Sequence, residues 1–507
     1  MPRRARLLPT ALLGSLLLLL LLAARPLTHL WLTHRRDVAA PRPPHPGQAI
    51  DLSPYSLTPV ARQVRVVADT AAALRQLRQV LAEARRQHLP VAIAGARHSQ
   101  GGHSLAPHGL QLDLQAFNYM YLDPATNLLT VGSGARWAEV IPYLNRYGRA
   151  VHTMQSDNAF SVGGSLSVNC HGWQPNQPPI AATVVSLRVL LADGRLLTCS
   201  RREHPDLFGL VLGGYGLLGV IVDARLRTVP NAVYQYRRAT GPATAYLALY
   251  DRYVARNPRV GLAYGRLQVT PAHFLEEASL NYFEGPAASA PPGAPLPAPG
   301  LAGFKRVIFL GSKRDAYGKQ LRWQAEQVFA RTQVGHSFTR NQVMNESPAL
   351  YLNRSAGQTD VLHEYFIPRR GFEAFRQALR QRVPAHPAAD LLNVTLRNVY
   401  ADSVTCLPYA REEVFGFVLF FNQALTPAAE ADMAALTREL VDAAHRCGGT
   451  YYLPYRPHPT SAQLRQAYPG FDAFVAGKRR YDPEQLFQNQ FYQRYAPAGP
   501  VATASAR

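Results

Sequence analysis

The sequence predicts an α+β fold, with two mixed domains behind an apolar N-terminal segment. From about residue 60, short apolar runs with a period of two alternate with helical patterns, several of which end at glycine. After Pro230 the pattern changes, and a stretch rich in proline, glycine and alanine interrupts it at residues 285–303. No internal repeat is evident. These observations favour layered α/β domains over a repeat protein.

The first domain, expected over residues 55–230, begins with a strand, a helix and a second strand. Residues 63–69 alternate as a strand, Asp69 or Thr70 caps a helix with an apolar face, and residues 91–95 form a short buried strand. Two more strands are expected at 110–114 and 128–134, followed by a helix at 136–148. A hairpin over 184–200 should turn at Asp193-Gly194.

The second domain, expected over residues 231–450, repeats this mixture of elements. Its strands are predicted at 361–368, 391–400 and 415–424, and its helices at 371–383 and 428–444. The insert at 285–303 cannot form a packed core and is expected to be disordered on the surface. The tail, 451–496, is aromatic and rich in proline but lacks strong periodicity.

The N-terminus predicts a membrane segment. The apolar run from Leu7 to Ala24 is long enough to cross a bilayer, so residues 1–36 are interpreted as a signal anchor and 37–54 as a linker. A cleaved signal on an exported protein is the alternative. Arginines flank the run on both sides, so its orientation stays open.

Composition narrows the function classes. The net charge is +21, but it is dispersed, and no nucleic-acid-binding motif accompanies it, so no nucleic-acid partner is expected. The four cysteines form no CxxC pair, which argues against a disulfide scaffold or a zinc ribbon.

Residues 161–173 (SVGGSLSVNCHGW) have the composition of an anion-binding loop. Gly163 and Gly164 remove side chains where the backbone must approach something closely, and Ser165, Ser167 and Asn169 supply short polar groups. Successive N–H groups in such a loop suit a pyrophosphate. A tight turn of small residues is the alternative.

A second glycine-rich stretch matches G-x-G-x-x-G at Gly214, Gly216 and Gly219. A nicotinamide-type fingerprint needs a strand before it and a helix after it. Here a helical pattern, 204–214, precedes the glycines and an alternating pattern, 220–229, follows them. That type of site is therefore excluded, and a bend beside a ligand remains.

Three histidines, His98, His103 and His108, are spaced five residues apart in a loop marked by Gly101 and Gly102. Helical metal ligands are spaced by four, and no acidic residue or cysteine lies nearby in the sequence. The pattern does not favour a metal site.

Together these stretches resemble the FAD-binding domain of the vanillyl-alcohol oxidase/p-cresol methylhydroxylase (PCMH) superfamily, most closely its sugar-lactone and alditol oxidases. The likeness lies in AGARHS (94–99), GGSLSVNCHG (163–172), GGYGLLGVI (213–221) and the terminal KRRYDPEQLFQNQF (478–491). It implies a PCMH-type domain of two subdomains, a substrate cap over 231–450, and a C-terminal segment, 451–496, that returns to the flavin.

The resemblance also implies the cofactor and its contacts. FAD is expected, with His98 as the first candidate for a covalent bond to the flavin 8α-methyl group and His103 as the second; non-covalent FAD is the alternative. The other implied contacts are Gly95, Arg97, Ser99, Gly102, Asp157, Gly163, Gly164, Ser165, Ser167, Asn169, Gly172, Gly216, Gly219, Val220, Ile221 and Asn489.

Two charged residues inside apolar strand patterns, Glu364 and Arg397, are the catalytic candidates. A charge in such a position requires a partner or a task. The resemblance implies a Glu and an Arg or Lys on cap strands that bind hydroxyls and help remove the alcohol proton. A structural ion pair between the two is the alternative. Weaker candidates for substrate contacts are Tyr365, Asn393, Asn422, Tyr455, Arg456 and His458.

The resemblance therefore implies an FAD-dependent oxidoreductase like D-arabinono-1,4-lactone oxidase. It would remove hydride from a CH–OH donor, such as a sugar lactone or polyol, and pass the electrons to oxygen or another acceptor. A dehydrogenase or sterol-type reductase with non-covalent FAD keeps the fold but changes the chemistry. A basic, membrane-tethered binding module without a cofactor is the alternative from another class.

Overall fold

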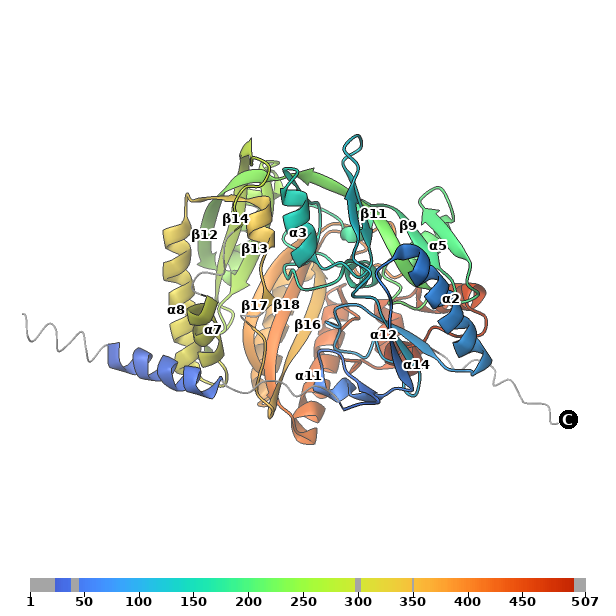
Figure 1. Ribbon diagram of the computed structural model, residues 1–507. Coiled ribbons are helices and arrows are strands. Elements are labelled where there is room, and N and C mark those ends of the chain that lie inside the picture. Colours follow the sequence, from blue (N-terminus) through green and yellow to red (C-terminus); the bar gives the residue numbers. More distant parts are fainter. Residues whose placement is uncertain (1–22, 38–44, 297–301, 349–350, 497–507) are drawn as a thin grey trace, which may run out of the picture.

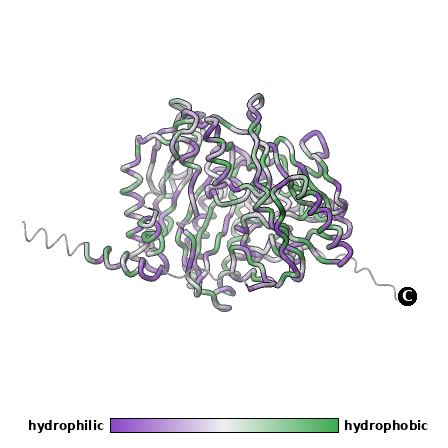
Figure 2. Tube along the Cα trace, in the orientation of Figure 1, coloured by the Kyte–Doolittle hydropathy of each residue, from purple (hydrophilic) through white to green (hydrophobic). Residues whose placement is uncertain are grey.

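The computed structural model describes residues 23–37, 45–296, 302–348 and 351–496. Figure 1 shows two mixed regions side by side, with the strands β12 to β18 in one and the early strands and helices in the other. Hydrophobic residues run along the central strands, whereas the outer turns of helices such as α8 are hydrophilic (Figure 2). This is the amphipathic arrangement that a layered α+β fold requires.

A small parallel sheet opens the first region. Its order is β3-β5-β4, and α2 connects β3 to β4 along the chain. Asp69 caps α2 by accepting the backbone N–H of Ala72 at 2.8 Å. The bounds are β3 (Arg62–Arg65), α2 (Thr70–Arg86), β4 (Val91–Ala94) and β5 (Leu110–Asp113).

A six-stranded sheet follows, in the order β10-β9-β11-β7-β6, with β8 also paired to β11. Its strands are β6 (Met120–Leu122), β7 (Leu128–Gly132), β8 (Arg149–Val151), β9 (Val184–Leu190), β10 (Leu196–Ser200) and β11 (Val220–Pro230). Between them lie α3 (Trp137–Asn145), α4 (Val162–Ser167) and α5 (Pro205–Val211). Each of its strand pairs is antiparallel, including the predicted β9–β10 hairpin.

The chain crosses into a third sheet at Asn231, where β11 ends and β12 begins. This eight-stranded sheet has the order β15-β12-β14-β13-β17-β18-β16-β19. Its strands are β12 (Ala232–Pro242), β13 (Val260–Leu267), β14 (Glu277–Ser289), β15 (Ser337–Thr339), β16 (Gln358–Pro368), β17 (Asp390–Val399), β18 (Val414–Ala424) and β19 (Thr450–Tyr451). We call residues 232–451 the cap.

The two faces of the cap sheet have different neighbours. On one face, α10 (Phe372–Arg382) and α11 (Pro427–Arg446) pack against β16, as the contacts of His363 with Thr437 and of Tyr365 with Phe375 show. On the other face, α7 (Ala302–Gly311) places Phe309 against Phe420, and α8 (Ala316–Gln333) follows it. Because side chains alternate along each strand, successive residues of a strand point to opposite faces of the cap sheet.

The tail contains three helices that its weak periodicity did not predict: α12 (Ser461–Ala467), α13 (Phe471–Tyr481) and α14 (Gln490–Tyr495). The terminal signature joins the tail to the first region. Lys478 and Asp482 form a fully buried ion pair at 2.7 Å, and Asp482 also accepts the N–H of Phe487. Phe487 in turn bridges Val91 of β4 in parallel.

Three expectations about loops and linkers are wrong in part. Residues 285–289 of the supposed disordered insert continue β14 and pair with β12, because that strand extends past the change in composition. Residues 161–167 contain α4 in place of an irregular loop. The supposed linker contains β1 (Gln48–Ala49), which pairs with β2 (Thr58–Pro59).

The apolar run from Leu7 lies outside the described residues up to position 22. A helix over residues 23–36 follows it and contacts α7, with His29 Nε2 2.9 Å from the carbonyl oxygen of Gly311. Among the helices that the structure describes, none combines the length and the apolar character that a membrane span requires.

Candidate functional site

A cavity of about 1270 Å³ lies between the first region and the face of the cap sheet opposite α10 and α11. It exceeds the roughly 300–1,000 Å³ of ordinary small-molecule pockets, so it has room for a cofactor and a substrate together. The cap contributes lining residues that alternate along its strands: Asp360, Leu362 and Glu364 from β16, Asn393, Thr395 and Arg397 from β17, and Val418 and Phe420 from β18.

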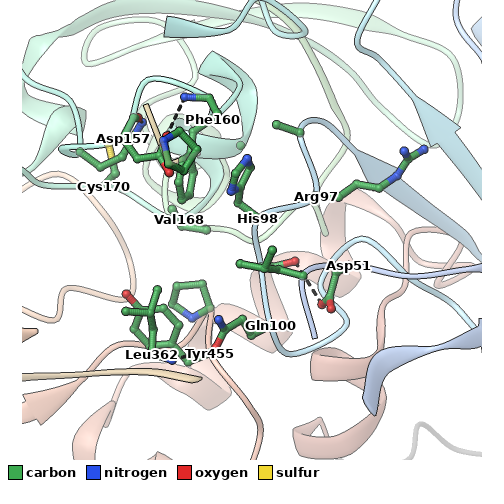
Figure 3. Close-up of a pocket in the computed structure, with 18 of the residues that line it drawn as sticks. Asp51, Arg97, His98, Gln100, Asp157, Phe160, Val168, Cys170, Leu362 and Tyr455 are labelled. Atoms are coloured by element: carbon green, nitrogen blue, oxygen red, sulfur yellow. Dashed lines mark hydrogen bonds between the residues drawn. The ribbon is translucent and has the colours of Figure 1, made fainter. Parts of the chain in front are cut away.

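The first predicted stretch follows β4 and lines this cavity. A Cβ on Gly95 would lie 2.1 Å from Ser161 Oγ, so only glycine fits where the two stretches cross. His98 stacks on Phe160 with ring centroids 4.3 Å apart, and Figure 3 shows both rings at the cavity wall. Burial lowers the pKa of His98 to about 4, so its imidazole is neutral at neutral pH.

Arg97 points away from His98 in Figure 3 and pairs with Asp113 at 2.9 Å. Its φ of 57° turns the chain so that consecutive side chains face opposite ways. Arg97 lines the cavity, but its charge is balanced by this contact with β5. We therefore interpret it as a support of the His98 loop.

Asp51 holds the same loop from the segment interpreted as a linker. Its carboxylate accepts the N–H of Gly102 and the N–H of Ser53, each at 2.8 Å, and the hydroxyl of Ser56 at 2.6 Å. Burial raises the pKa of Asp51 to about 6 against these hydrogen bonds. Asp51 was not predicted, because its contact with the distant Gly102 arises only in the folded chain.

The second stretch forms α4 and the turn after it. A Cβ on Gly163 would meet Ser133 Cβ at 2.7 Å, and Ser161 caps the helix through the N–H of Gly164. Gly164 and Ser167 also line the cavity. Asn169 instead donates to Asp402 at 2.8 Å, in the loop that follows β17.

The third stretch bends before β11. Gly216 and Gly219 have φ of 74° and 153°, and a Cβ on Gly219 would lie 2.6 Å from the carbonyl oxygen of Leu190. Asn489 joins this bend to the first stretch by donating to the carbonyl oxygens of Tyr215 (2.9 Å) and His103 (3.1 Å).

His103 also borders the cavity, but it is enclosed by aromatic rings. Its imidazole lies 5.1 Å from the Phe491 ring and 5.4 Å from the Tyr215 ring, measured between centroids. Burial lowers its pKa to about 3. This packing favours His98 over His103 as the imidazole available to a ligand.

Glu364 is the least exposed of the acids that line the cavity among the described residues, with 3 % of its surface exposed. His171 Nε2 lies 2.6 Å from one carboxylate oxygen, and the Tyr455 hydroxyl donates to the other at 3.1 Å. Burial raises the pKa of Glu364, but His171, Arg397 and Tyr455 outweigh that effect and hold the pKa below its usual value. The carboxylate is therefore the stable form.

Arg397 does not form the alternative ion pair with Glu364. Its guanidinium donates to Ser156 Oγ at 3.0 Å, and no carboxylate oxygen of the described chain lies within 4.0 Å of it. Glycine at position 416, across the register from Arg397, leaves open the space beside Glu364. Both charged groups thus face the cavity from the two strands that flank β18.

Most of the other predicted contacts line the cavity as well, including Ser99, Asp157 and Ile221. The predicted residues that lie behind its wall are Gly102, Ser165, Asn169, Gly172, Val220 and Asn489; they support the loops and do not face the cavity. For Ser165, the reason is a hydrogen bond from Trp137 Nε1 at 2.8 Å.

Of the weaker candidates, Tyr455 and Asn393 line the cavity. Tyr365 lies on the opposite face of β16 because the side chains alternate. Asn422 binds Asp360, and Arg456 and His458 bind Glu430. His171 was not predicted, although its place beside Gly172 in the second stretch could have indicated it.

The residues present fit FAD. Three glycine-containing stretches meet at one cavity, and the buried hydroxyls of Ser104 and Ser133 border it without a hydrogen-bond partner in the described chain. Such unpaired hydroxyls can bind the polar groups of a cofactor. No group of three or more potential metal ligands occurs among the described residues.

Comparison with known proteins agrees with this geometry. Residues 67–200 match the FAD binding domain family. This part of the chain is a PCMH-type FAD-binding domain. FAD is the cofactor, and the chain is an FAD-dependent oxidoreductase.

The names of two relatives of this FAD-dependent oxidoreductase give different substrates, and the name of a third gives none. A D-arabinono-1,4-lactone oxidase of Yarrowia lipolytica is 32% identical over 31% of this chain and 31% of its own length. Cytokinin dehydrogenase 6 of Oryza sativa is 26% identical over 78% of this chain and 80% of its own. An uncharacterized oxidoreductase of Rhodococcoides fascians is 26% identical over 85% and 92%.

Proposed function

We propose that the protein oxidises a CH–OH donor, and that Glu364 is the base that takes the alcohol proton. The observation that carries the proposal is the environment of Glu364: an ionised carboxylate, buried between His171 of the FAD-binding domain and Tyr455, at the wall of a cavity that suits FAD. A carboxylate accepts a proton only in its charged form, and the position of Glu364 at the cavity wall exposes it to a bound substrate.

Glu364 and Arg397 then have separate roles in the reaction. Glu364 accepts the proton of the substrate hydroxyl, while Arg397 holds the same oxygen and stabilises the negative charge that develops on it. The enclosing strands β16, β17 and β18 exclude water from the reacting carbon. When bound, FAD supplies the acceptor for the hydride that leaves this carbon.

The proposal is tested by reduction of the bound FAD in the absence of oxygen. Purified protein is mixed with alditols and sugar lactones, and the flavin absorbance is followed. We expect bleaching with members of this set, and recolouring when air or an artificial acceptor is admitted. Absence of bleaching by every alcohol, from a protein that contains FAD, would overturn the proposal.

A cytokinin donor is the second candidate, because the match to cytokinin dehydrogenase 6 spans most of both chains. The polar residues of the cavity, among them Asn393 and Thr395, support a hydroxylated substrate, whereas the apolar residues Leu362, Val418 and Phe420 suit the apolar side chain of a cytokinin. The same anaerobic assay with isopentenyladenine decides between the two: bleaching by this compound alone would favour the second candidate.

We also propose that His98 bonds covalently to the flavin. Its neutral imidazole and its position on the cavity wall support this role, since an uncharged ring nitrogen is the nucleophilic form.

The apolar run from Leu7 to Ala24 supports a proposal of membrane anchoring. Deletion of residues 1–22 should move the protein from the membrane fraction to the soluble fraction with its FAD retained, because the helix over 23–36 and its contact with α7 are kept. A full-length protein that is already soluble, and begins after residue 24, would instead identify a cleaved signal.

A further inference from the structure

One row of residues crosses the cap sheet on its cavity face. Glu364 of β16 is in register with Val418 of β18, Val418 with Thr395 of β17, and Thr395 with Arg266 of β13. Neighbouring strands are about 4.8 Å apart, so Glu364 and Arg266 lie roughly 14 Å apart at opposite ends of the row. A substrate whose alcohol carbon lies at Glu364 can therefore extend toward Arg266.

Arg266 forms no direct ion pair within the described chain, although the effect of burial on its pKa is outweighed by the nearby acids Glu326 and Glu346, which raise it. It donates to Thr395 Oγ1 at 2.8 Å, and in the described parts of the chain no carboxylate oxygen comes within 4.0 Å of its guanidinium. The neighbouring Arg322, by contrast, binds Glu326 at 2.8 Å and donates to the carbonyl oxygen of Leu392. A guanidinium that faces a cavity without a direct ion pair can bind an anionic ligand.

Thr395 adds a donor at the same place. Its oxygen accepts from Arg266 and from Asn393 Nδ2 at 2.9 Å. The orientation of Asn393 is set by Arg322, which can only donate and therefore faces the amide oxygen, at 3.4 Å. The Thr395 hydroxyl hydrogen thus has no acceptor among the described residues, although only 6 % of this side chain is exposed.

The acids that the structure describes near Arg266 do not pair with it directly. Glu346, which also lines the cavity, accepts the Tyr351 hydroxyl at 3.1 Å, and burial raises its pKa although the charge of Arg266 opposes that effect. Glu326 forms its ion pair with Arg322, and Glu364 is engaged by His171.

We propose that the substrate carries a carboxylate, bound by Arg266 and the Thr395 hydroxyl, while its alcohol carbon lies at Glu364. The substrate class is thus a polyhydroxy carboxylic acid, such as an aldonate, in place of a neutral polyol or lactone. This inference rests on the proposed function. Oxidation converts one CH–OH group to C=O, with the proton passing to Glu364, the hydride to FAD, and the carboxylate unchanged.

The experiment compares aldonates with alditols of equal chain length, using D-gluconate with D-sorbitol and D-xylonate with xylitol. Anaerobic reduction of the flavin is followed in the wild type, Arg266→Met, Arg266→Lys and Thr395→Val. Arg237→Met is the matched control, because Arg237 lies on the cap strand β12, near Glu284 (3.6 Å), and does not line the cavity.

We expect wild-type protein to prefer the aldonates. Arg266→Met should lose roughly tenfold to a hundredfold in kcat/KM for them, mainly through KM, with little change for alditols. Arg266→Lys should retain part of this preference, Thr395→Val should lose less, and Arg237→Met should behave as wild type. Thr395→Val keeps the test valid if Arg266→Met does not fold.

Binding is measured separately from the flavin difference spectrum on titration with D-gluconate. If alditols reduce the flavin but gluconate neither reduces nor perturbs it, the carboxylate site is wrong and the alcohol oxidation stands. If no alcohol reduces the flavin, yet gluconate binds the wild type and not Arg266→Met, the anion site stands and the proposed function falls. Equal binding to both proteins overturns the inference.

Discussion

Single residues in the cavity owe their chemistry to partners on other elements. Glu364 is ionised because His171 follows α4 and Tyr455 follows β19, so two segments converge on one carboxylate. His98 and His103 belong to the same loop, yet one stacks at the cavity wall and the other is enclosed by Tyr215 and Phe491. Burial alone does not assign a role; the groups in contact do.

Glu364→Gln should lower substrate turnover by roughly 10²- to 10⁴-fold, because the amide cannot accept the proton. Arg397→Met should lower turnover as well. Flavin content should not change in either variant, and Glu412→Gln, at an exposed site, is the matched control. Steady-state rates and the ratio of FAD to protein check this. Normal turnover together with a much lower melting temperature would assign both residues a structural role.

His98→Ala should release the flavin when the protein is precipitated with acid, whereas the wild-type pellet should stay yellow. The reason is that a covalent bond survives unfolding and a non-covalent contact does not. His108→Ala is the control and should keep the colour. A wild-type pellet without colour would show that the bond is absent, and release by His103→Ala alone would assign the bond to that residue.

At the scale of elements, the three glycine-rich stretches pack closely against their neighbours because glycine has no side chain at the points of contact. Gly95 faces Ser161, Gly163 faces Ser133, and Gly219 faces the backbone of β9. The cofactor loops are therefore held together by close approach of backbones as well as by hydrogen bonds.

Gly163→Ala should weaken FAD retention and lower the free energy of unfolding by about 1–3 kcal/mol, because the new methyl group overlaps Ser133. Alanine is the better helix former, so helix propensity would act in the opposite direction. Gly303→Ala in α7 is the matched control, since nothing lies within 4 Å of its Cβ position. Flavin content and urea unfolding check the pair; equal behaviour would contradict the assigned contact.

At the scale of the whole molecule, the cavity lies between the loops of the first region and one face of the cap sheet. The chain passes from β11 into β12 at Asn231, and the tail then returns, with Phe487 beside β4. Each region contributes what the other lacks: the first supplies the cofactor loops, and the cap supplies the polar strand face.

The buried histidines should make the folded state sensitive to acid. The pKa of His103 is about 3 when folded and ordinarily about 6.5, so its stabilising contribution is complete above pH 6.5 and is lost as the pH falls below that value. Between pH 7.5 and 5, this loss is about 2 kcal/mol. His103→Gln should therefore lose about 2 kcal/mol less than the wild type over this interval. Urea unfolding at both pH values measures it; an identical loss would contradict a neutral, buried His103.

Much of the secondary structure could be predicted, because its signals are local. The periods of β16, β17 and β18, the Asp69 cap of α2 and the Asp193-Gly194 turn depend on neighbouring residues alone. The helices of the tail and the continuation of β14 could not be predicted, since burial against distant elements stabilises them more than their own patterns do.

The sequence by itself determined that the chain has an FAD-binding domain, because bare glycines and small polar residues at three places are the local requirement for holding the cofactor. It also singled out Glu364 and Arg397 as charges within apolar strands. Only the tertiary structure decided the partners of these charges, which are His171 for Glu364 and Ser156 for Arg397. It also brought Asp51 to the His98 loop and left Arg266 without a direct ion pair in the described chain. Such pairings depend on which strands become neighbours and in which register, and that is set by the packing of the whole chain.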